Sequence, residues 1–308
     1  MADRRAVFVV NPASDGGSTG KKWPEIADAA RRHGLEVVDR LTESAGHATA
    51  LAREAVAAGE ELVVAVGGDG TVNEVVNGFF DESGASLSGG AALGVIERGT
   101  GCDFVRTFGI PKNTDRAVAT IAAGKRRRID VGRATCQGPA GPQVRMFANI
   151  ASCGMSGAVA ERANATSKRL GGTPAFLFAT VATFAGWRNV EFHVKADDVE
   201  RTLVANNVVC ANCRYFGGGM KIAPDALPDD GLLDVILVGD ISKADFVLNL
   251  HRLYRGTLGR HRKVEILRAR KIEITPVRTL PAEIDGEQPG TTPVTFEAVP
   301  GALDLIVP

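Results

Sequence analysis

The sequence predicts an α/β protein in which a doubly wound α/β domain is followed by a mostly antiparallel β domain. In the first 131 residues, short apolar runs alternate with longer helical patterns, which is typical of consecutive β–α units around a parallel sheet. After Val131 the helical patterns become rare and many short β-type runs follow one another. We therefore expect a first domain over residues 1–131 and a second over residues 132–299.

The elements of the first domain follow from uninterrupted apolar runs and from glycines that end helices. The expected strands are Ala6–Val10, Leu35–Leu41, Glu61–Val66 and Leu93–Ile96. The expected helices are Lys21–His33, Ala45–Ala58 and one from Val72 to about Phe80. Parallel strands that are buried on both faces show such continuous apolar runs. Because ligands bind at the carboxyl ends of parallel strands, the loops after these strands are the candidate sites.

The second domain begins with a Gly/Pro-rich segment, Gln137–Pro142, that predicts a turn. The β-type runs that follow are Arg145–Ala151, Val190–Lys195, Thr202–Cys210, Leu232–Val238, Val264–Thr275 and Val294–Val299. Two helical stretches are expected among them, near Thr173–Trp187 and over Lys243–Gly256.

Composition excludes some classes of function. Lys+Arg and Asp+Glu each number 36, so the net charge is zero, whereas a nucleic-acid binder needs a basic excess. Five cysteines in 308 residues are few and odd in number, so a disulfide scaffold is not expected and a reducing compartment fits better. The longest uncharged run, Leu170 to Trp187, is weaker than a membrane span, and the N-terminus has no signal-peptide pattern. We expect a cytoplasmic protein whose membrane contact is peripheral.

The strongest local pattern runs from Gly67 to Glu74 and reads GGDGTVNE. Its glycines let backbone N–H groups approach a ligand, and the following helix presents its positive end, which suits phosphate. Asp69 places a carboxylate where a divalent cation could join it to phosphate oxygens. The spacing fits equally well a tight β–α turn in which Asp69 caps a helix.

Two further glycine loops follow other strands of the first domain. One runs from Gly99 to Phe104, where Thr100 can donate a hydrogen bond and Asp103 can cap a helix. The other runs from Asn11 to Gly17. Gly20-Lys21 nearby imitates a P-loop, but Lys22 stands where Ser or Thr is needed. Three loops at adjacent strand ends are better evidence for a site than one.

Near the C-terminus, Asp285 and Glu287 are separated by one glycine in the segment IDGE. In a strand, the two carboxylates point to the same face, where one can bind metal while the other takes a proton from a hydroxyl. The alternative is an Asp-Gly turn with solvated acids.

Together these motifs resemble the diacylglycerol kinase catalytic domain family, which includes bacterial lipid kinases, sphingosine kinases and ceramide kinases. The resemblance covers nearly the whole chain, because Phe216–Pro224 and Asp230–Asp234 are similar to the family's second-domain motif. It implies a nucleotide-binding α/β domain followed by a β-sandwich domain of the NAD kinase/diacylglycerol kinase type. It also implies an active site in the cleft between the domains, and a return of residues 300–308 to the first domain.

The resemblance further implies an ATP-dependent kinase that phosphorylates a hydroxyl of diacylglycerol or a similar lipid and gives a phospholipid such as phosphatidic acid. The residues that match the family's ATP contacts are Asn11, Thr42, Gly67, Gly68, Asp69, Gly70, Thr71, Val72, Asn73 and Thr100. Leu227, Asp230 and Leu232 match a structural Mg²⁺ site. Glu287 corresponds to the general base, with Asp285 beside it, and Asp69 is the third catalytic acid.

Two departures keep other functions open. The family usually has Pro and Asn where this chain has Glu97 and Cys102. An NAD kinase-like enzyme shares the GGDG loop but phosphorylates a soluble dinucleotide. A third reading is a catalytically weak homologue that binds lipid or regulates another protein. A homodimer is compatible with the sequence.

Two features bear on lipid access. Apolar residues at helical spacing suit either a core or a lipid groove; they are Phe176, Leu177, Phe178, Val181, Phe184 and Trp187. Basic residues that suit either anionic lipid heads or solvated edges are Arg252, Arg255, Arg260, Arg262 and Lys263, and the run Lys125–Arg128.

Overall fold

The structure is a computed structural model that describes residues 4–170 and 180–308, and the side chains of these residues except 164–170. The described chain divides into two compact units, Met1–Asp130 with Gly301–Pro308, and Val131–Pro300. Of the expected helix Thr173–Trp187, residues 173–179 lie outside the described residues, as do Phe176, Leu177 and Phe178.

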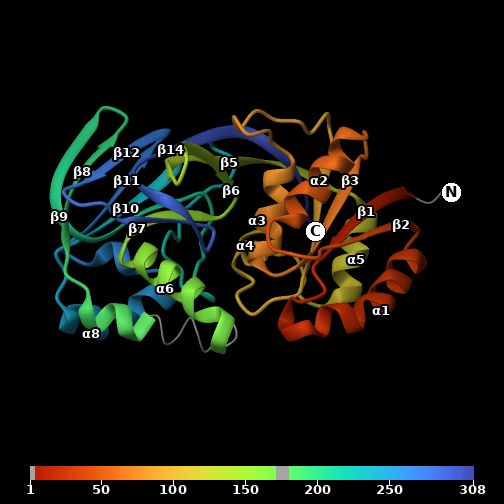
Figure 1. The fold of residues 1–308 in the computed structure, drawn as a ribbon, viewed down its shortest axis with the longest axis horizontal. Helices are drawn as coiled ribbons and strands as arrows, with labels where there is room; N and C mark the ends of the chain where they lie inside the picture. The colour runs from red at the N-terminus through yellow and green to blue at the C-terminus, as the bar shows by residue number, and fades with distance from the viewer. Residues whose placement is uncertain (1–3, 171–179) are drawn as a thin grey trace. The chain divides into compact units, whose positions relative to one another are not determined.

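The first unit is built on a parallel sheet (Figure 1). Its strands, in the spatial order β2-β1-β3-β4, are β2 (Leu35–Leu41), β1 (Arg4–Val10), β3 (Leu62–Gly67) and β4 (Ala92–Glu97). The last residues of β14 (Glu287–Ile306) add to this sheet, because Asp304 and Leu305 pair in parallel with Ala92 and Leu93 of β4.

Helices cover both faces of this sheet, as the alternation of strand and helix predicts (Figure 1). They are α1 (Ser18–Arg32), α2 (His47–Ala57), α3 (Asp69–Gly78), α4 (Asp103–Phe108) and α5 (Thr114–Ala123), with a 3₁₀ turn at Asp15–Gly17. Trp23 and Ile26 of α1 and Ile121 of α5 share a buried cluster with Phe8 of β1. The helices α2 and α3 pack on each other and on β1 and β3.

The predicted start of α3 is wrong by three residues. The helix begins at Asp69 rather than Val72, because Gly68 is still extended at φ −88° and ψ −175° and the helical conformation starts immediately after it. Asp69 and Thr71 therefore lie in the first turn of a helix rather than in a loop. Likewise α1 begins at Ser18 rather than Lys21, after Gly17 at φ +85°.

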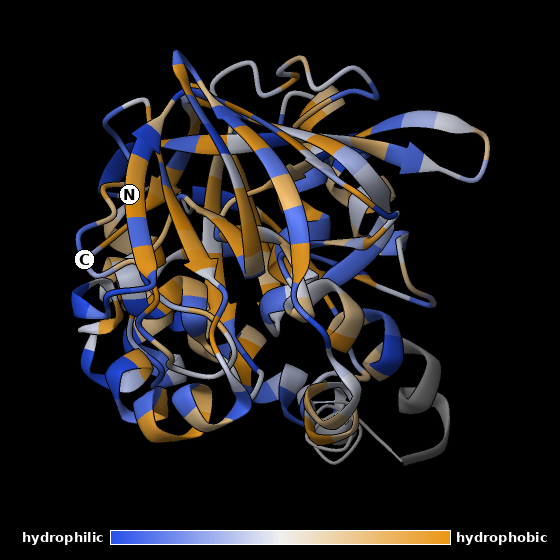
Figure 2. Cartoon of the chain, turned by 90° about the vertical axis from the view of Figure 1, so that its left-hand side faces the viewer, coloured by the Kyte–Doolittle hydropathy of each residue, from blue (hydrophilic) through white to orange (hydrophobic). Residues whose placement is uncertain are grey.

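The second unit is mostly antiparallel. Its strands are most of β5 (Arg126–Gly138), β6 (Gly141–Phe147), β7 (Ile150–Gly154), β8 (Val190–Ala196), β9 (Val199–Ala211), β10 (Leu233–Gly239), β11 (Val264–Ala269), β12 (Lys271–Pro276), β13 (Pro281–Ile284) and most of β14. They pair in the order β11-β10-β9-β7-β13-β14, and β12 joins β14 to β8, which also pairs with β9. Figure 2 shows strands banded alternately in hydrophobic and hydrophilic residues, as expected when one face of each strand is buried.

Two of the expected strands are each divided in the structure. The run Arg145–Ala151 contains the end of β6 and the start of β7, and Val264–Thr275 is divided into β11 and β12 at Arg270. The sequence also gives no signal for α6 (Met155–Leu170), whose first turns are rich in small residues. Residues 180–186 are helical, followed later by α8 (Lys243–Arg255) and a 3₁₀ turn at Leu258–Arg260.

Candidate active site

The three glycine loops of the first unit are tied together at the carboxyl ends of β1, β3 and β4. The Asn11 amide Nδ2 donates to the Thr71 hydroxyl at 3.0 Å, and the Asn11 Oδ1 accepts from the backbone of Ala13 at 3.1 Å. A Cβ on Gly67 would lie 2.4 Å from the Thr71 Oγ1, so only glycine fits there. The first loop is thereby fixed to the N-terminal turn of α3.

Arg98 joins the loop after β4 to the loop after β1. Its backbone N–H donates to the Gly67 carbonyl at 2.7 Å, and its guanidinium Nη2 donates to the Asp15 carboxylate at 3.0 Å. Beside it, a Cβ on Gly99 would lie 2.7 Å from the Cα of Gly68, so the two backbones are in contact. Of the expected contact residues, Thr100 is exposed in the loop after β4, and Thr42 is half-buried directly after β2, where its backbone N–H donates to the Val10 carbonyl at 2.8 Å.

Asp69 is the first residue of α3, but its carboxylate caps the N-terminus of α4. Its Oδ1 accepts the backbone N–H groups of Asp103 at 3.1 Å and Phe104 at 3.3 Å, the first two residues of α4. These groups have no partner within the helix, so the carboxylate satisfies them and is favoured by the helix dipole. Its Oδ2 faces Gly101, where a Cβ would lie 2.4 Å away. Asp69 thus connects the GGDG loop with the loop after β4.

Glu74, the last residue of the GGDGTVNE motif, caps the N-terminus of α2. Its two carboxylate oxygens accept the backbone N–H groups of Gly46 at 2.9 Å and Ala48 at 3.1 Å. The two acids of α3 therefore organise the N-termini of both neighbouring helices. Val72 and Asn73, also expected at the nucleotide, are buried in α3.

Glu97 lies beneath these loops and is only 6 % exposed. Within the described part of the chain, neither of its carboxyl oxygens has a hydrogen-bond partner. Burial, with the nearby charge of Asp69 as the next cause, raises the pKa of Glu97 to about 9, against the lowering effect of Lys112. The group is therefore neutral at pH 7, and it adds no negative charge to the loops.

Cys102 is the N-cap of α4 and has φ +54°, a conformation that Asn adopts more readily than Cys. Its thiol lies 3.3 Å from the Gly99 carbonyl, and burial raises its pKa. This position requires a left-handed backbone conformation, and in this chain Cys102 adopts it.

The segment from Ile284 to Glu287 is a hairpin turn, so the prediction that its two acids share one face of a strand is wrong. Asp285 and Gly286 have φ +48° and φ +89°, and Ile284 pairs with Glu287 across the turn. Two consecutive residues with positive φ form the I′ type of turn that Asp-Gly favours. Asp285 and Glu287 therefore stand in different environments.

Asp285 organises the backbone between β6 and β7. Its Oδ2 accepts from the backbone of Ala148 at 2.9 Å, and its Oδ1 accepts from Asn149 at 3.1 Å and Ile150 at 2.8 Å. The alternative from the sequence, an Asp-Gly turn with solvated acids, is therefore right about the turn but wrong about Asp285, whose carboxylate accepts three backbone N–H groups. Glu287 is exposed as the first residue of β14.

A third acid of this hairpin, Glu283, was missed. It is 8 % exposed; its Oε1 accepts the backbone N–H of Gly286 at 2.6 Å and its Oε2 accepts the Ser152 hydroxyl. Ser152 is in turn bonded to Ser156 at 2.7 Å. Burial raises the pKa of Glu283 to about 7, against the lowering effect of these two hydrogen bonds. The alternation of acids at 283, 285 and 287 was the signal that could have drawn attention to it.

Comparison with known proteins assigns both units to one family. The family model described as the diacylglycerol kinase catalytic domain matches residues 5–134, and that described as the YegS C-terminal NAD kinase beta sandwich-like domain matches residues 149–307. This chain belongs to the diacylglycerol kinase catalytic domain family. The prediction of the family and of a two-part α/β and β-sandwich fold is confirmed.

Relatives in this family match over nearly their whole length. The chain is 30% identical to the "Probable lipid kinase YegS-like" of Pseudomonas syringae pv. syringae (strain B728a), covering 100% of this chain and 95% of the relative. It is 28% identical to the "Diacylglycerol kinase" of Bacillus subtilis (strain 168), covering 99% and 97%. A crystal structure of a putative diacylglycerol kinase from Bacillus anthracis str. Sterne shares the fold, with a TM-score of 0.78 at 22% identity over 100% and 99% of the chains.

Family membership makes the chain a lipid kinase, that is, a phosphotransferase, and ATP use follows from the kinase family. Among the described helices, none is both long and apolar enough to cross a bilayer. All five cysteines of this lipid kinase are buried and none forms a disulfide, and the described residues contain no cluster of three His, Cys, Asp or Glu side chains that suits a metal ion.

The proposed structural Mg²⁺ site of this lipid kinase has oxygen donors but a competing cation. Asp230 accepts the backbone N–H of Leu232 on its Oδ1 at 3.0 Å, and its Oδ2 forms an ion pair with Arg268. Arg268 also lies 3.3 Å from Asp234, whose pKa burial raises to about 6, with Asp225 as the second cause. Carboxylate and carbonyl oxygens suit a hard cation, but Arg268 already neutralises Asp230.

Proposed function

We propose that this lipid kinase transfers the γ-phosphoryl group of ATP to a free hydroxyl of diacylglycerol or a similar lipid, giving a product such as phosphatidic acid. The observation that carries the proposal is the joining of three glycine loops at the carboxyl ends of β1, β3 and β4, where α3 also begins. Backbone N–H groups and a helix N-terminus in such a place suit an anionic phosphate chain.

The proposed nucleotide contacts divide by exposure. Gly67 to Thr71 supply backbone N–H groups, and the Thr71 side chain, which is buried, holds the loop in shape through its hydrogen bond with Asn11. Thr100 is exposed and Thr42 is half-buried, and we assign both to direct contact with the ligand. Because Val72 and Asn73 are buried, their contribution is to hold the first turns of α3 in place. Mg²⁺ that arrives with ATP neutralises the phosphate charge, and the Oδ2 of Asp69 is the carboxylate atom in this unit that we assign to it.

Glu287 is the proposed general base. As the lipid hydroxyl oxygen forms its bond to the γ-phosphorus, its proton passes to the Glu287 carboxylate, and the bond from that phosphorus to the bridging oxygen of ATP breaks to release ADP. Asp285 positions the base by fixing the turn and the β6–β7 connection, and Glu283 supports the turn from behind through Gly286. The lipid meets the enzyme peripherally, at a membrane surface.

The structural Mg²⁺ remains part of the proposal, at the carbonyls of Leu227 and Leu232 and the carboxylate of Asp230. Both oxygens of that carboxylate are already bonded, so binding of the ion requires Arg268 to move away. No chemical step depends on this ion.

A radiolabelled-ATP assay tests the acceptor. The panel comprises diacylglycerol, monoacylglycerol, sphingosine, ceramide and phosphatidylglycerol, with a soluble dinucleotide as the test of the NAD kinase-like alternative. We expect label on diacylglycerol or a close analogue, and a labelling rate ~10²–10⁴-fold lower with the Glu287→Gln enzyme. Label on the dinucleotide alone, or on no acceptor, contradicts the proposal; the second result favours a catalytically weak lipid-binding or regulatory homologue.

A further inference from the structure

The outer face of α8 is apolar and exposed, which is unusual for a helix of a water-exposed unit. On this face Leu248 is 72 % exposed, Val247 60 % and Tyr254 57 %. At 100° per residue these side chains share one side of the helix with Ala244, His251 and Arg255. Leu253, on the opposite side, packs into a buried cluster. We call the six residues Ala244, Val247, Leu248, His251, Tyr254 and Arg255 the α8 outer face.

The charge on and beside the α8 outer face is of one sign. The face contains no carboxylate; its basic residues are His251 and Arg255, and the exposed Arg260 and Arg262 follow α8 closely in the chain. The acid of this helix, Asp245, is engaged elsewhere, because it completes the cap with Ser242 and pairs with Lys263 at 3.2 Å. Exposed apolar residues flanked by cations without matching acids are typical of helices that lie on anionic membranes.

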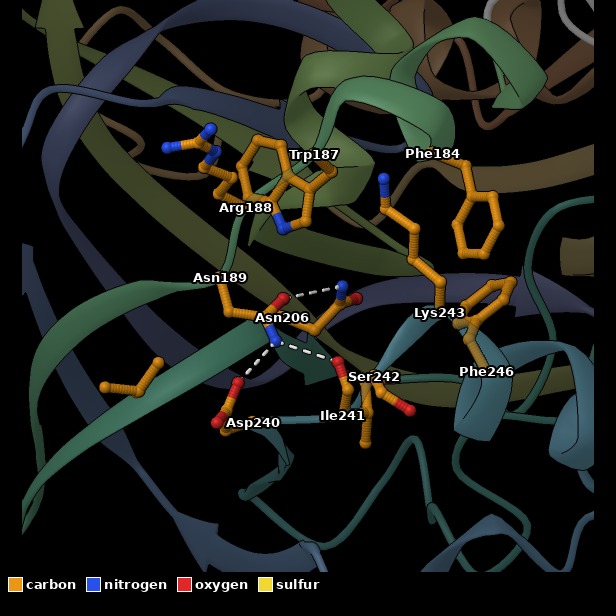
Figure 3. A pocket seen from close by; sticks show the side chains of 11 residues that line it. Phe184, Trp187, Arg188, Asn189, Asn206, Asp240, Ile241, Ser242, Lys243 and Phe246 are labelled. Atoms are coloured by element: carbon orange, nitrogen blue, oxygen red, sulfur yellow. Dashed lines mark hydrogen bonds between the residues drawn. The ribbon is translucent and has the colours of Figure 1, made fainter.

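The N-terminal end of α8 is held by the helical stretch 180–186. The rings of Phe184 and Phe246 lie 4.9 Å apart (Figure 3), and Lys243 donates to the carbonyl of Ala185. Nearby, the Asn189 side chain donates to Asp240 and to the Ile241 carbonyl and accepts from Asn206 (Figure 3). Phe184, Asn189, Asn206 and Asp240 line a pocket of about 300 Å³ together with Lys243 and Phe246 of α8. The inner side of α8 is therefore anchored while its outer face is exposed.

We propose that the α8 outer face docks this enzyme on an anionic lipid surface, with Val247 and Leu248 entering the interfacial layer and the arginines lying among the head groups. The charge of this face favours a membrane over a second copy of the chain. A two-fold contact of this face with itself would bring His251 and Arg255 against the same cations, with no acid to oppose them. The inference rests on the proposed function only in that the substrate is a lipid, since docking needs no catalysis.

Vesicle co-sedimentation tests the docking. The probes are phosphatidylcholine vesicles with and without about one third phosphatidylglycerol, a composition chosen to give a clearly anionic surface. Wild-type protein should bind the anionic vesicles more tightly than the neutral ones. The double variant Val247→Ser/Leu248→Ser should bind them ~10-fold or more weakly, because two apolar side chains no longer leave water.

The matched control is Val277→Ser, which removes a side chain 70 % exposed between β12 and β13 and should bind like wild type. Both variants should keep the wild-type Tm and kcat on a short-chain diacylglycerol in detergent. Equal binding of the double variant, or equal binding of wild type to neutral vesicles, overturns the inference. So does a double variant whose only change is a loss of self-association.

The two proposals fail separately. An enzyme that docks through α8 but phosphorylates no lipid contradicts the proposed function and supports this inference. An enzyme that phosphorylates short-chain diacylglycerol and binds vesicles independently of Val247 and Leu248 supports the proposed function and contradicts this inference.

Discussion

At the scale of single residues, the proposed chemistry depends most directly on Glu287. Glu287→Gln keeps the shape of this exposed side chain and removes its basicity, so kcat should fall ~10²–10⁴-fold. The Tm and ATP affinity should change little, because the side chain is exposed at the start of β14. Steady-state kinetics measure kcat, a nucleotide-binding assay measures the ATP affinity, and thermal unfolding measures the Tm. An unchanged kcat, or a defect confined to ATP binding, removes Glu287 from the role of base.

Asp285→Asn should behave differently from Glu287→Gln. One of two oxygens that accept three backbone N–H groups is replaced by an amide NH₂, so a donor faces donors. We expect the free energy of unfolding to fall by about 1–3 kcal/mol, together with a loss of activity. Chemical denaturation measures the first effect. If Asp285→Asn retains full stability but loses activity, Asp285 is the base or binds substrate, and its positioning role is wrong.

Glu97 makes a prediction about pH. Its pKa is about 9 in the folded chain, well above the ordinary value of 4.5, so the folded state binds more protons between these two values. Stability that this group contributes therefore falls as pH rises from 4.5 to 9, by about 1 kcal/mol per pH unit. Glu97→Gln has no such dependence and should be more stable than wild type, by a margin that grows with pH.

Urea unfolding of both proteins between pH 5.5 and 8.5, without nucleotide or Mg²⁺, measures that margin. Parallel stability curves for the two proteins would show that Glu97 is ionised, and therefore paired, in the folded chain.

At the scale of elements, α3 is the organiser of the first unit. Asp69 caps α4 and Glu74 caps α2, so one helix holds the N-termini of two others. This explains why the segment from Gly67 to Glu74 carries acids at both ends, in addition to any contact with phosphate.

Substitutions at Asp69 separate the capping role from the catalytic one. Asp69→Ala should abolish turnover and lower the free energy of unfolding by about 1–2 kcal/mol, as for other lost caps. Asp69→Asn keeps an acceptor for α4, so it should retain most of the stability and still lose turnover. Glu74→Ala is the control, with a similar loss of stability and turnover largely preserved. Near-normal kcat for Asp69→Asn with Mg²⁺ would falsify the assignment of Asp69 to the phosphates.

At the scale of the whole molecule, the proposed structural ion links metal to global stability. Mg²⁺ bound only by the folded state should raise the Tm, by an amount that corresponds to ~2.7 kcal/mol at 100 times the Kd. Asp230→Ala should abolish this effect. Arg268→Met should shift the Mg²⁺ titration to lower concentrations, because the competing cation is gone. If Mg²⁺ leaves the wild-type Tm unchanged, Arg268 is the permanent partner of Asp230 and the metal site is wrong.

Much of the architecture and the location of the loops could be predicted from sequence alone. The strand Leu35–Leu41 was predicted to the residue, and the strands of the first unit lie within two residues of prediction at each end. These features depend on the period of apolar residues and on glycine backbone freedom, which are local properties. The Asp-Gly dipeptide favours a tight turn for the same local reason, but we predicted a strand at Asp285–Glu287 with the turn only as the alternative, and the structure has the turn.

The roles of the acids could not be predicted, because they depend on segments far away in the chain. Asp69 meets its N–H donors 34 and 35 residues later, and Asp285 accepts from groups 135 to 137 residues earlier. Whether a carboxylate caps a helix, supports a turn or stays free for chemistry is decided by its burial and by the donors that reach it. The sequence by itself therefore determined the family, the parallel sheet of repeated β–α units and the glycine loops, whereas the strand order β2-β1-β3-β4 came from the structure. Only the tertiary structure decided that Asp285 and Glu283 are engaged by the backbone while Glu287 remains exposed, since these environments form only when β6, β7 and β13 come together.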